Sequence, residues 1–205
     1  SSLNYSASYG VSTMARPLNV FTADEYRKQV VALGGVLEDF KGNTDWQKEI
    51  SRTAVTQNHN LSFGGGADKL TYYGSFGIQN QEGIIKNSQL NRYTGRLNVT
   101  QKLLKDRLTV DVNLNATQTY NERPPIESVL GSAISTNPTI PAYDANGNIY
   151  LYQSGTNPLL ALKLEKDATT TTRILGNISP SLKITDHLTY KLNFGIDYSN
   201  AHRDL

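Results

Sequence analysis

The sequence of 205 residues has no cysteine, a single tryptophan and a single methionine. The lack of cysteine excludes a disulfide framework and any metal or redox site built on thiolates. No apolar run reaches the roughly 18 residues that a membrane-spanning helix requires, and no charged segment precedes an apolar one as in a signal peptide. Neither a transmembrane helix nor a signal peptide is predicted. The chain also begins and stops within alternating patterns, at Leu3 and near Leu205, which is expected of a segment of a larger protein.

Charge is also scarce. Charged residues make up 19% of the chain, the net charge is +2 and no block of lysine and arginine occurs, so no nucleic-acid partner is predicted. Hydrophobic residues make up 38%, which is below the usual share for globular proteins. Two classes of all-β protein fit this composition. One is a soluble domain, and the other is an outer-membrane barrel, whose apolar content is diluted by a hydrophilic lumen.

The sequence is rich in two-residue alternation, the pattern of a β-strand with one apolar and one polar face. In the clearest case, Leu97 and Val99 alternate with Arg96 and Asn98. Seven strands are predicted in this way: Leu3–Met14, Gln57–Phe63, Leu70–Ile78, Tyr93–Leu103, Leu108–Tyr120, Arg173–Ile184 and Leu188–Ser199. The short segment 104–107 allows only an antiparallel hairpin between the two strands that it joins.

Short helices are predicted in the longer connections. Thr22 and Glu25 form a capping box for a helix that runs to about Leu33 and stops at Gly34. A second box, Thr44–Gln47, begins a helix that runs to about Arg52. Further predictions are a helix over Ile126–Ser135, a hairpin over Tyr143–Tyr150, a helix over Leu159–Glu165 that starts at Asn157 and Pro158, and a tight turn over Gly64–Lys69 whose glycines supply positive φ.

The connections alternate in length, so all short turns are expected at one end of the sheet and all large loops at the other. Aromatic residues sit near the ends of the apolar faces: Phe63, Tyr72 and Tyr190 toward the short turns, and Tyr120 and Tyr198 toward the loops. The eight residues from Tyr190 to Tyr198 rise about 20 Å at ~3.3 Å per residue and a tilt of ~40°. This distance approximates the apolar band of a bilayer with its two aromatic girdles.

Two readings of the apolar faces compete. In a soluble β-sandwich or β-helix they would meet in a core, whereas in a membrane barrel they would face lipid. Three features favour the barrel: strands about twice as long as usual, glycines such as Gly74, Gly95 and Gly176 where a core needs volume, and the asymmetry of turns and loops. Gln57 and His59 fit poorly, because they share a face with Leu61. Either that half of the strand rises above the membrane or another protein covers it.

Several local motifs have ordinary explanations. The spacing of Gly64–Lys69 is wrong for a phosphate or dinucleotide loop. Asp144, Asn146 and Asn148 imitate the start of a calcium loop, but Gly155 stands where the loop needs a glutamate, so a plain hairpin is favoured. The histidines (His59, His187 and His202) are scattered, and no catalytic, cofactor or metal site is predicted. The aromatic residues of the long loops either bind sugar or a lid, or simply pack the loops: Trp46, Tyr143, Tyr150 and Tyr152.

The sequence from Trp46 to Asn98 resembles the early barrel of SusC/RagA-type TonB-dependent transporters. The matching segments are Trp46–Ile50, Arg52–Ala54, Gln57–Ser62, Gly64–Gly65, Tyr72–Gly77, Gln81–Ile84 and Arg92–Asn98. Thr22–Tyr26 and Pro141–Asn148 are similar to loop motifs of the same family. The chain departs from the pattern at Ile78 and Gln79, where the family often has an aromatic residue.

The resemblance implies an all-β fold in which residues 1–205 are the N-terminal part of an antiparallel transmembrane barrel of about 22 strands. About seven strands would lie here, with short helices in the long extracellular loops, and the plug domain and remaining strands would lie outside this sequence. On this reading the polar-face charges Arg96, Lys102, Asp111, Lys191 and Asp197 are solvated lumen residues that also pair with the plug.

The same resemblance implies a nutrient importer of the bacterial outer membrane rather than an enzyme. It would take up glycans or peptides, be energised by TonB through the plug, and work with a SusD-like surface lipoprotein as a lid. The alternative is a secreted or surface β-domain that binds polysaccharide without transport. An all-β glycan hydrolase is a third class, but no pair of catalytic carboxylates is identified in the sequence.

Overall fold

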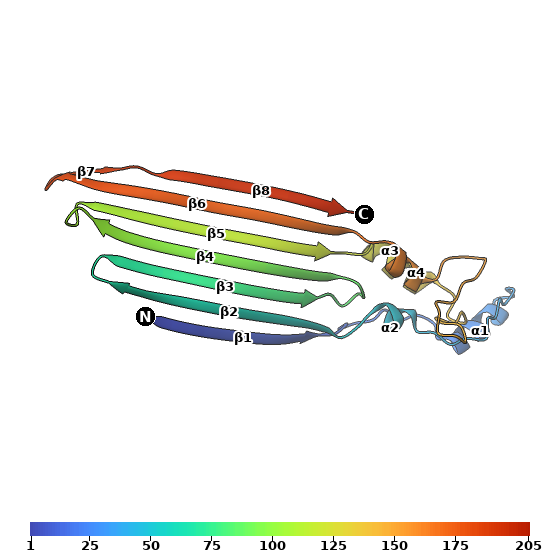
Figure 1. Ribbon diagram of the computed structural model, residues 1–205. Helices are drawn as coiled ribbons and strands as arrows, with labels where there is room; N and C mark the ends of the chain where they lie inside the picture. Colours follow the sequence, from blue (N-terminus) through green and yellow to red (C-terminus); the bar gives the residue numbers. More distant parts are fainter.

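The computed structural model describes all residues, Ser1–Leu205. The chain forms a single antiparallel sheet of long strands, and the helices and large loops lie at one end of these strands (Figure 1). The strands are β1 (Ser2–Ser12), β2 (Ala54–Ala67), β3 (Leu70–Glu82), β4 (Gln89–Leu103), β5 (Leu108–Glu122), β6 (Ala168–Thr185), β7 (Leu188–Lys191) and β8 (Phe194–Asp204). They lie side by side in chain order, with β7 and β8 sharing the outer edge of β6.

The predicted antiparallel architecture is confirmed. The turns β2–β3, β4–β5 and β6–β7 all lie at one end of the sheet, and the connections β1–β2, β3–β4 and β5–β6 lie at the other (Figure 1). Most strands, though not β1, extend further toward the loop end than predicted: β4 and β5 have 15 residues each and β6 has 18. These lengths are far above the 5–6 residues that are common in soluble sheets.

The predicted glycine turn at Gly64–Lys69 is wrong. Gly34 and Gly147 are the glycines with positive φ in this chain, whereas Gly64, Gly65 and Gly66 continue β2 in register with β3. The reversal is made at positions 68–69 alone. A Cβ on Gly65 would lie 2.7 Å from the Tyr72 hydroxyl oxygen, so this glycine makes room for a neighbouring ring.

Two helix starts differ in how well they were predicted. The Thr22 capping box is present at α1 (Ala23–Ala32), and Gly34 follows the helix with a φ of +73°. At α2 (Trp46–Ile50) the cap is Asp45 rather than Thr44, because the Thr44 hydroxyl donates a hydrogen bond of 2.6 Å to the Ile140 carbonyl.

The end of α2 is also earlier than predicted. Ser51 forms a β-bridge with Ile85, and the Arg52 amide donates to the Ile84 carbonyl at 2.8 Å. These contacts with the β3–β4 connection take the backbone out of the helix at Ile50.

The strand predicted over Leu188–Ser199 is interrupted between β7 and β8. Pro180 of β6 accepts a hydrogen bond from the Leu192 amide at 2.9 Å, but as a proline it has no N–H to return. The ladder is therefore incomplete at this point. The first strand likewise ends at Ser12 rather than Met14.

The apolar face of the sheet is uncovered. Leu97, Leu114 and Ile178, in the middle of three central strands, are 38%, 42% and 44% exposed, and no helix packs on this face (Figure 1). The arrangement contradicts the sandwich alternative, which would bury the same residues beneath a second layer. No helix is both long and apolar enough to cross a membrane.

The buried core of the molecule lies in the connections at the loop end. We call this part the loop cap, comprising residues 13–53, 83–88 and 123–167. It contains α1, α2, α3 (Ile126–Ser135) and α4 (Pro158–Leu164). A single buried cluster joins its three segments: Trp46, Ile50, Ile85, Val129, Ala133, Ile140, Ala142, Leu159 and Leu162. The helices at 126–135 and near 159–165 were predicted; their common core was not.

Candidate functional site

The apolar face forms one continuous surface because the strand register aligns its apolar residues. One cross-strand row illustrates this: Leu3, Phe63, Gly74, Leu97, Leu114, Gly176 and Ile196 occupy partnered positions from β1 to β8. The glycines of the row are covered by neighbouring side chains, since a Cβ on Gly74 would meet the Phe63 ring and one on Gly176 would lie 2.8 Å from an Ile196 methyl group. The surface therefore stays apolar even at the row positions that have no side chain of their own.

This apolar surface has a border toward the loop end. On β2, β3, β4, β5, β6 and β8 the continuous apolar run of this face ends in two adjacent cross-strand rows, at Leu61, Ile78, Tyr93, Ala116, Ile174 and Tyr198. Beyond these rows β2, β5 and β6 carry only the isolated residues Val55, Tyr120 and Ala168, whereas Tyr9 and Val11 of β1 continue the apolar face. From Tyr93 to Leu103 on β4 the distance is roughly 33 Å along the strand, or about 25 Å at a tilt of ~40°, which is the height of a lipid-facing band. We call the surface within these limits the apolar band.

The border accounts for Gln57 and His59. Both lie on the loop side of it, as do Gln118, Thr172 and Asn200 of other strands. The register therefore favours a strand that continues beyond the apolar band. The His59 ring is also satisfied within the sheet, because its Nδ1 lies 2.7 Å from the Tyr5 hydroxyl and the Tyr9 ring meets it edge-on.

The opposite face, called here the polar face, carries the strand cations. Every Lys and Arg of the strands lies on it: Arg92, Arg96, Lys102, Arg173, Lys183, Lys191 and Arg203. Asp111 and Asp197 lie there too, so all five charges predicted for this face are confirmed. Asp197 pairs with Arg173 at 3.2 Å, and Asp111 accepts from the Thr100 hydroxyl at 2.6 Å.

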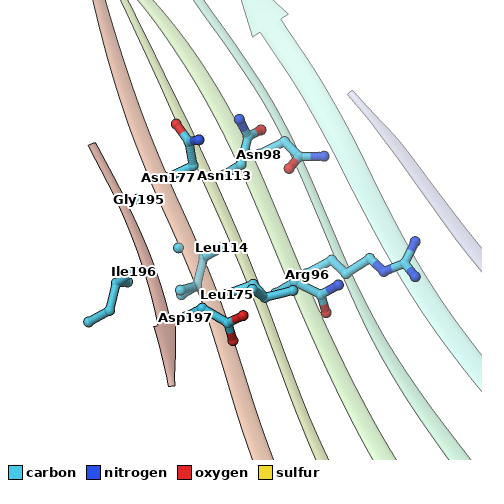
Figure 2. Close-up of a pocket in the computed structure, with 11 residues that line it drawn as sticks. Arg96, Asn98, Asn113, Leu114, Leu175, Asn177, Gly195, Ile196 and Asp197 are labelled. Atoms are coloured by element: carbon cyan, nitrogen blue, oxygen red, sulfur yellow. The ribbon is translucent and has the colours of Figure 1, made fainter. Parts of the chain in front are cut away.

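A pocket of about 680 Å³ opens on the polar face over β4, β5, β6 and β8 (Figure 2). Asn98, Asn113 and Asn177 occupy partnered positions on three adjacent strands. In the next row Arg96 partners Asn115, whose amide oxygen is buried and has no hydrogen-bond partner. The pocket is thus lined by side-chain amides with unused hydrogen-bonding capacity. These asparagines were not predicted to form a site, although their alternation with Leu97, Val112 and Leu114 in the sequence marked them as polar-face residues.

Loop packing, one of the two alternatives for the aromatic residues of the long loops, is correct for Trp46. It is 3% exposed, and its indole N–H donates to the Asn137 carbonyl at 3.3 Å. Tyr150 and Tyr152 pack partly against the same core, whereas Tyr143 is 44% exposed. Apolar residues at helical spacing, such as Val129 and Ala133, were the signal that could have revealed this core.

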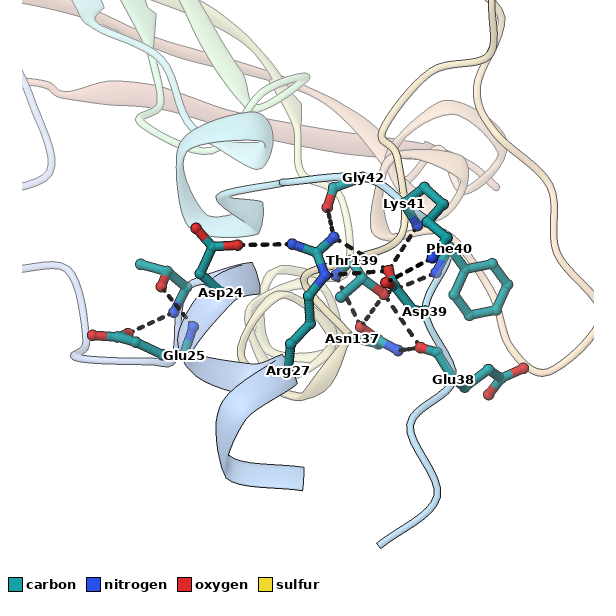
Figure 3. A network of polar contacts seen from close by, with 11 residues as sticks. Asp24, Glu25, Arg27, Glu38, Asp39, Phe40, Lys41, Gly42, Asn137 and Thr139 are labelled. Carbon is teal, nitrogen blue, oxygen red and sulfur yellow. Dashed lines mark hydrogen bonds and ion pairs between the residues drawn. The ribbon is translucent and has the colours of Figure 1, made fainter. Parts of the chain in front are cut away.

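A polar network stiffens the start of the loop cap (Figure 3). Arg27 of α1 donates to Asp24 at 2.9 Å, to Asp39 at 3.2 Å and to the Gly42 carbonyl at 2.7 Å. The backbone N–H of Lys41 and then the Arg27 guanidinium, both donating to the Asp39 carboxylate, lower its pKa to about 2. The network fixes the segment after α1 in a closed loop.

A second set of contacts ties that segment to the β5–β6 connection. The Asn137 amide donates to the Glu38 carbonyl at 2.8 Å, and the Gly42 amide donates to the Thr139 carbonyl at 2.6 Å. The loop cap is therefore held by polar contacts as well as by its apolar core.

The predicted hairpin in the same connection is confirmed. Tyr143 and Ile149 form a β-bridge, and the Asp144 carboxylate accepts from the Asn146 and Asn148 amides at 2.8 and 2.9 Å. No group of three His, Cys, Asp or Glu side chains is arranged to hold a metal ion.

Comparison with known proteins bears directly on this architecture. No family model matches the chain. The TonB-dependent receptor SusC of Bacteroides thetaiotaomicron is 29% identical over 210 residues, covering 89% of this chain and 21% of the receptor. TonB-dependent receptor P3 of Formosa agariphila is 26% identical over 211 residues, covering 97% of this chain and 21% of that receptor. The chain is homologous to SusC/RagA-type TonB-dependent receptors over most of its length.

Solved SusC/RagA-type structures share the fold. The RagAB peptide transporter matches with a TM-score of 0.75 at 22% identity, covering 97% of this chain and 28% of that one. The RagAB peptide importer in its closed-closed state gives a TM-score of 0.73 at 23% identity, covering 97% and 28%. The long antiparallel sheet with its short helices thus matches part of a TonB-dependent receptor barrel.

The similarity to this family bears on two further predictions, the cellular location and the absence of enzymatic activity. TonB-dependent receptors reside in the bacterial outer membrane, which confirms the predicted location. They are transporters, so the prediction that the chain is not an enzyme is also confirmed. The chain spans about a fifth of the length of these SusC/RagA-type relatives, 21% of each.

Proposed function

We propose that residues 1–205 form the N-terminal part of the barrel wall, and part of the extracellular mouth, of an outer-membrane nutrient importer. The observation that carries the proposal is the uncovered apolar band, about 25 Å high in the strand direction corrected for tilt, on a sheet whose other face is polar. Such a sheet suits a boundary between lipid and a hydrophilic lumen. The homology to TonB-dependent receptors supports the same assignment.

In this proposal the remaining strands, to a total of about 22, and a plug domain lie outside residues 1–205. The short turns face the periplasm and the loop cap faces the exterior. TonB acts on the plug to supply energy, and a SusD-like surface lipoprotein covers the mouth as a lid. The compact core of the loop cap supports a role as a rigid rim for such a lid.

The nutrient is a glycan or a peptide. SusC is a TonB-dependent receptor and RagAB is a peptide importer by name, and the low identity to RagAB leaves both substrate classes within the proposal.

Membrane fractionation and uptake test the proposal together. The full-length protein is expected in the outer membrane, soluble only with detergent, and deletion of its gene is expected to abolish uptake of one labelled glycan or peptide class. Solubility of the intact protein in aqueous buffer without detergent contradicts the proposal. It would favour instead a secreted or surface domain that binds polysaccharide without transport.

A further inference from the structure

Charge is separated between the two faces of the sheet. The polar face holds all strand lysines and arginines and only two strand carboxylates, Asp111 and Asp197. The other strand carboxylates, Glu82, Glu122 and Asp204, lie on the opposite face beyond the apolar band. Because a surface lined by one sign of charge concentrates ligands of the other sign, the polar face favours an anionic ligand.

Four cations of this face lack an ion pair, three of them on β4 and the fourth, Lys191, on β7. Arg96 and Lys102 make no side-chain hydrogen bond or ion pair, and Arg92 makes only a long contact of 3.4 Å with the Thr119 hydroxyl. By contrast, Arg173 pairs with Asp197 and Arg203 pairs with Asp167. β4 has no acidic residue, so it carries an uncompensated line of positive charge along the polar face.

Next to this line lies the asparagine row Asn98, Asn113 and Asn177. These three amides make no hydrogen bond to one another (Figure 2), and Figure 2 shows the Arg96 side chain reaching away from them across the neighbouring strand. A side-chain amide both donates and accepts, as a peptide group does. A guanidinium fits a carboxylate with two parallel hydrogen bonds.

Aromatic residues indicate which anionic polymer suits the surface. Tyr73 is the one aromatic side chain that the strands place on the polar face. All others lie on the opposite face: Tyr5, Tyr9, Phe63, Tyr72, Phe76, Tyr93, Tyr120, Tyr190, Phe194 and Tyr198. A surface rich in amides and poor in flat apolar rings suits a polypeptide better than an oligosaccharide, whose rings need such platforms.

We propose that Arg92, Arg96 and Lys102, with the asparagine row, form an anion-selective strip that binds an acidic peptide entering from the loop side. Arg96 binds a carboxylate of the peptide, and Asn98, Asn113 and Asn177 bind its peptide groups. This inference rests on the proposed import function and adds the charge class of the ligand.

The test uses the full-length protein in detergent micelles and fluorescently labelled octapeptides. One peptide carries four glutamates and its matched partner carries glutamine at the same positions. The acidic peptide is expected to bind more tightly, with an affinity that falls as salt is raised. R96Q is expected to weaken its binding roughly tenfold, the scale of a lost charge-assisted hydrogen bond, while leaving the glutamine peptide within about twofold.

K28Q is the matched control, because Lys28 is an exposed, unpaired lysine of α1 outside the sheet; its binding is expected to stay at the wild-type level. R96K is expected to restore part of the affinity. Heat-modifiable migration on gels shows that each variant has a folded barrel. A variant that fails this check is replaced by N113A, for which a several-fold loss with both peptides is expected.

Several results overturn the proposal. They are equal binding of the two peptides, equal effects of R96Q and K28Q, preference for a galacturonic acid hexamer over the acidic peptide, or a lower melting temperature of ligand-free R96Q with unchanged peptide affinity. The last result would assign Arg96 to a contact within the protein itself. Import without charge preference refutes the strip alone, whereas absence from the outer membrane refutes the import function.

Discussion

At the scale of single residues, neighbouring positions on a strand meet opposite environments. Leu114 lies in the apolar band and Asn113 lines the polar pocket. Leu114→Arg is expected to place a charge in lipid at a cost of about 2–4 kcal/mol, whereas Asn113→Arg adds a charge to a solvated face. The amount of folded full-length protein in the outer membrane, measured by heat-modifiable migration, should fall strongly for Leu114→Arg only. Equal yields of the two variants would show that this face does not meet lipid.

A second residue-scale prediction concerns the loop cap. Trp46 is almost fully buried there, so Trp46→Ala is expected to cost about 3–5 kcal/mol of local stability through lost burial and a cavity. Tyr143→Ala, at a half-exposed aromatic residue of the same region, is the control and should cost under about 1 kcal/mol. Hydrogen exchange of cap amides in the full-length protein measures both. Unchanged protection in Trp46→Ala would mean that the cap core does not depend on this residue.

At the scale of elements, the Asp39 network predicts a pH dependence of the segment between α1 and α2. Asp39 has a pKa of about 2 in the folded chain against 3.8 ordinarily. A lowered pKa means that the carboxylate stabilises the folded segment fully above about pH 4, and that this stabilisation is lost as the pH falls toward about 2. Protease resistance of residues 23–42 in the full-length protein should decline over that interval.

Asp39→Asn is the matched control for this pH effect. It cannot ionise, so its segment should be more open at neutral pH and should show a smaller change between pH 4 and pH 2. The same pH dependence in Asp39→Asn and in the wild type would assign the transition to another group.

The helices and strands also show which parts of the fold could be predicted from the sequence. Alternation located β3, β4 and β5 well because a one-residue shift would exchange the two faces. Gly64, Gly65 and Gly66 were misplaced because a glycine run is compatible both with a turn and with a strand beside a large ring such as Tyr72. The split between β7 and β8 depends on Pro180, a residue of the neighbouring strand, and no pattern within 188–199 records it.

The loop cap was harder still, because its core joins segments far apart in the chain. Trp46, Ile85 and Val129 come from three different connections, and the pattern within one connection does not show which residues of the other two it packs against. The polar pocket could be predicted only in part. Each asparagine was placed on the correct face by its strand, but the row across β4, β5 and β6 requires the register between strands.

At the scale of the whole molecule, the sheet has two outer strands with a single partner along most of their length: β1 pairs only with β2, and β8 pairs only with β6. Both are 11 residues long and exposed throughout. Unpaired backbone groups on such edges recruit further strands, more so in a membrane, where no water can satisfy them. The chain of residues 1–205, produced alone and refolded into detergent, should therefore form dimers or larger assemblies.

Light scattering measures the mass of the refolded chain, and infrared spectroscopy reports whether the added contacts are antiparallel strands. Proline substitutions give a specific check. Ala7→Pro in β1 together with Ser199→Pro in β8 removes one outward-facing N–H from each edge strand, so association should weaken relative to a chain carrying Ser154→Pro in the loop cap. A stable monomer of the unsubstituted chain would show that the edges are satisfied in another way, and the sheet would then not need further barrel strands beside it.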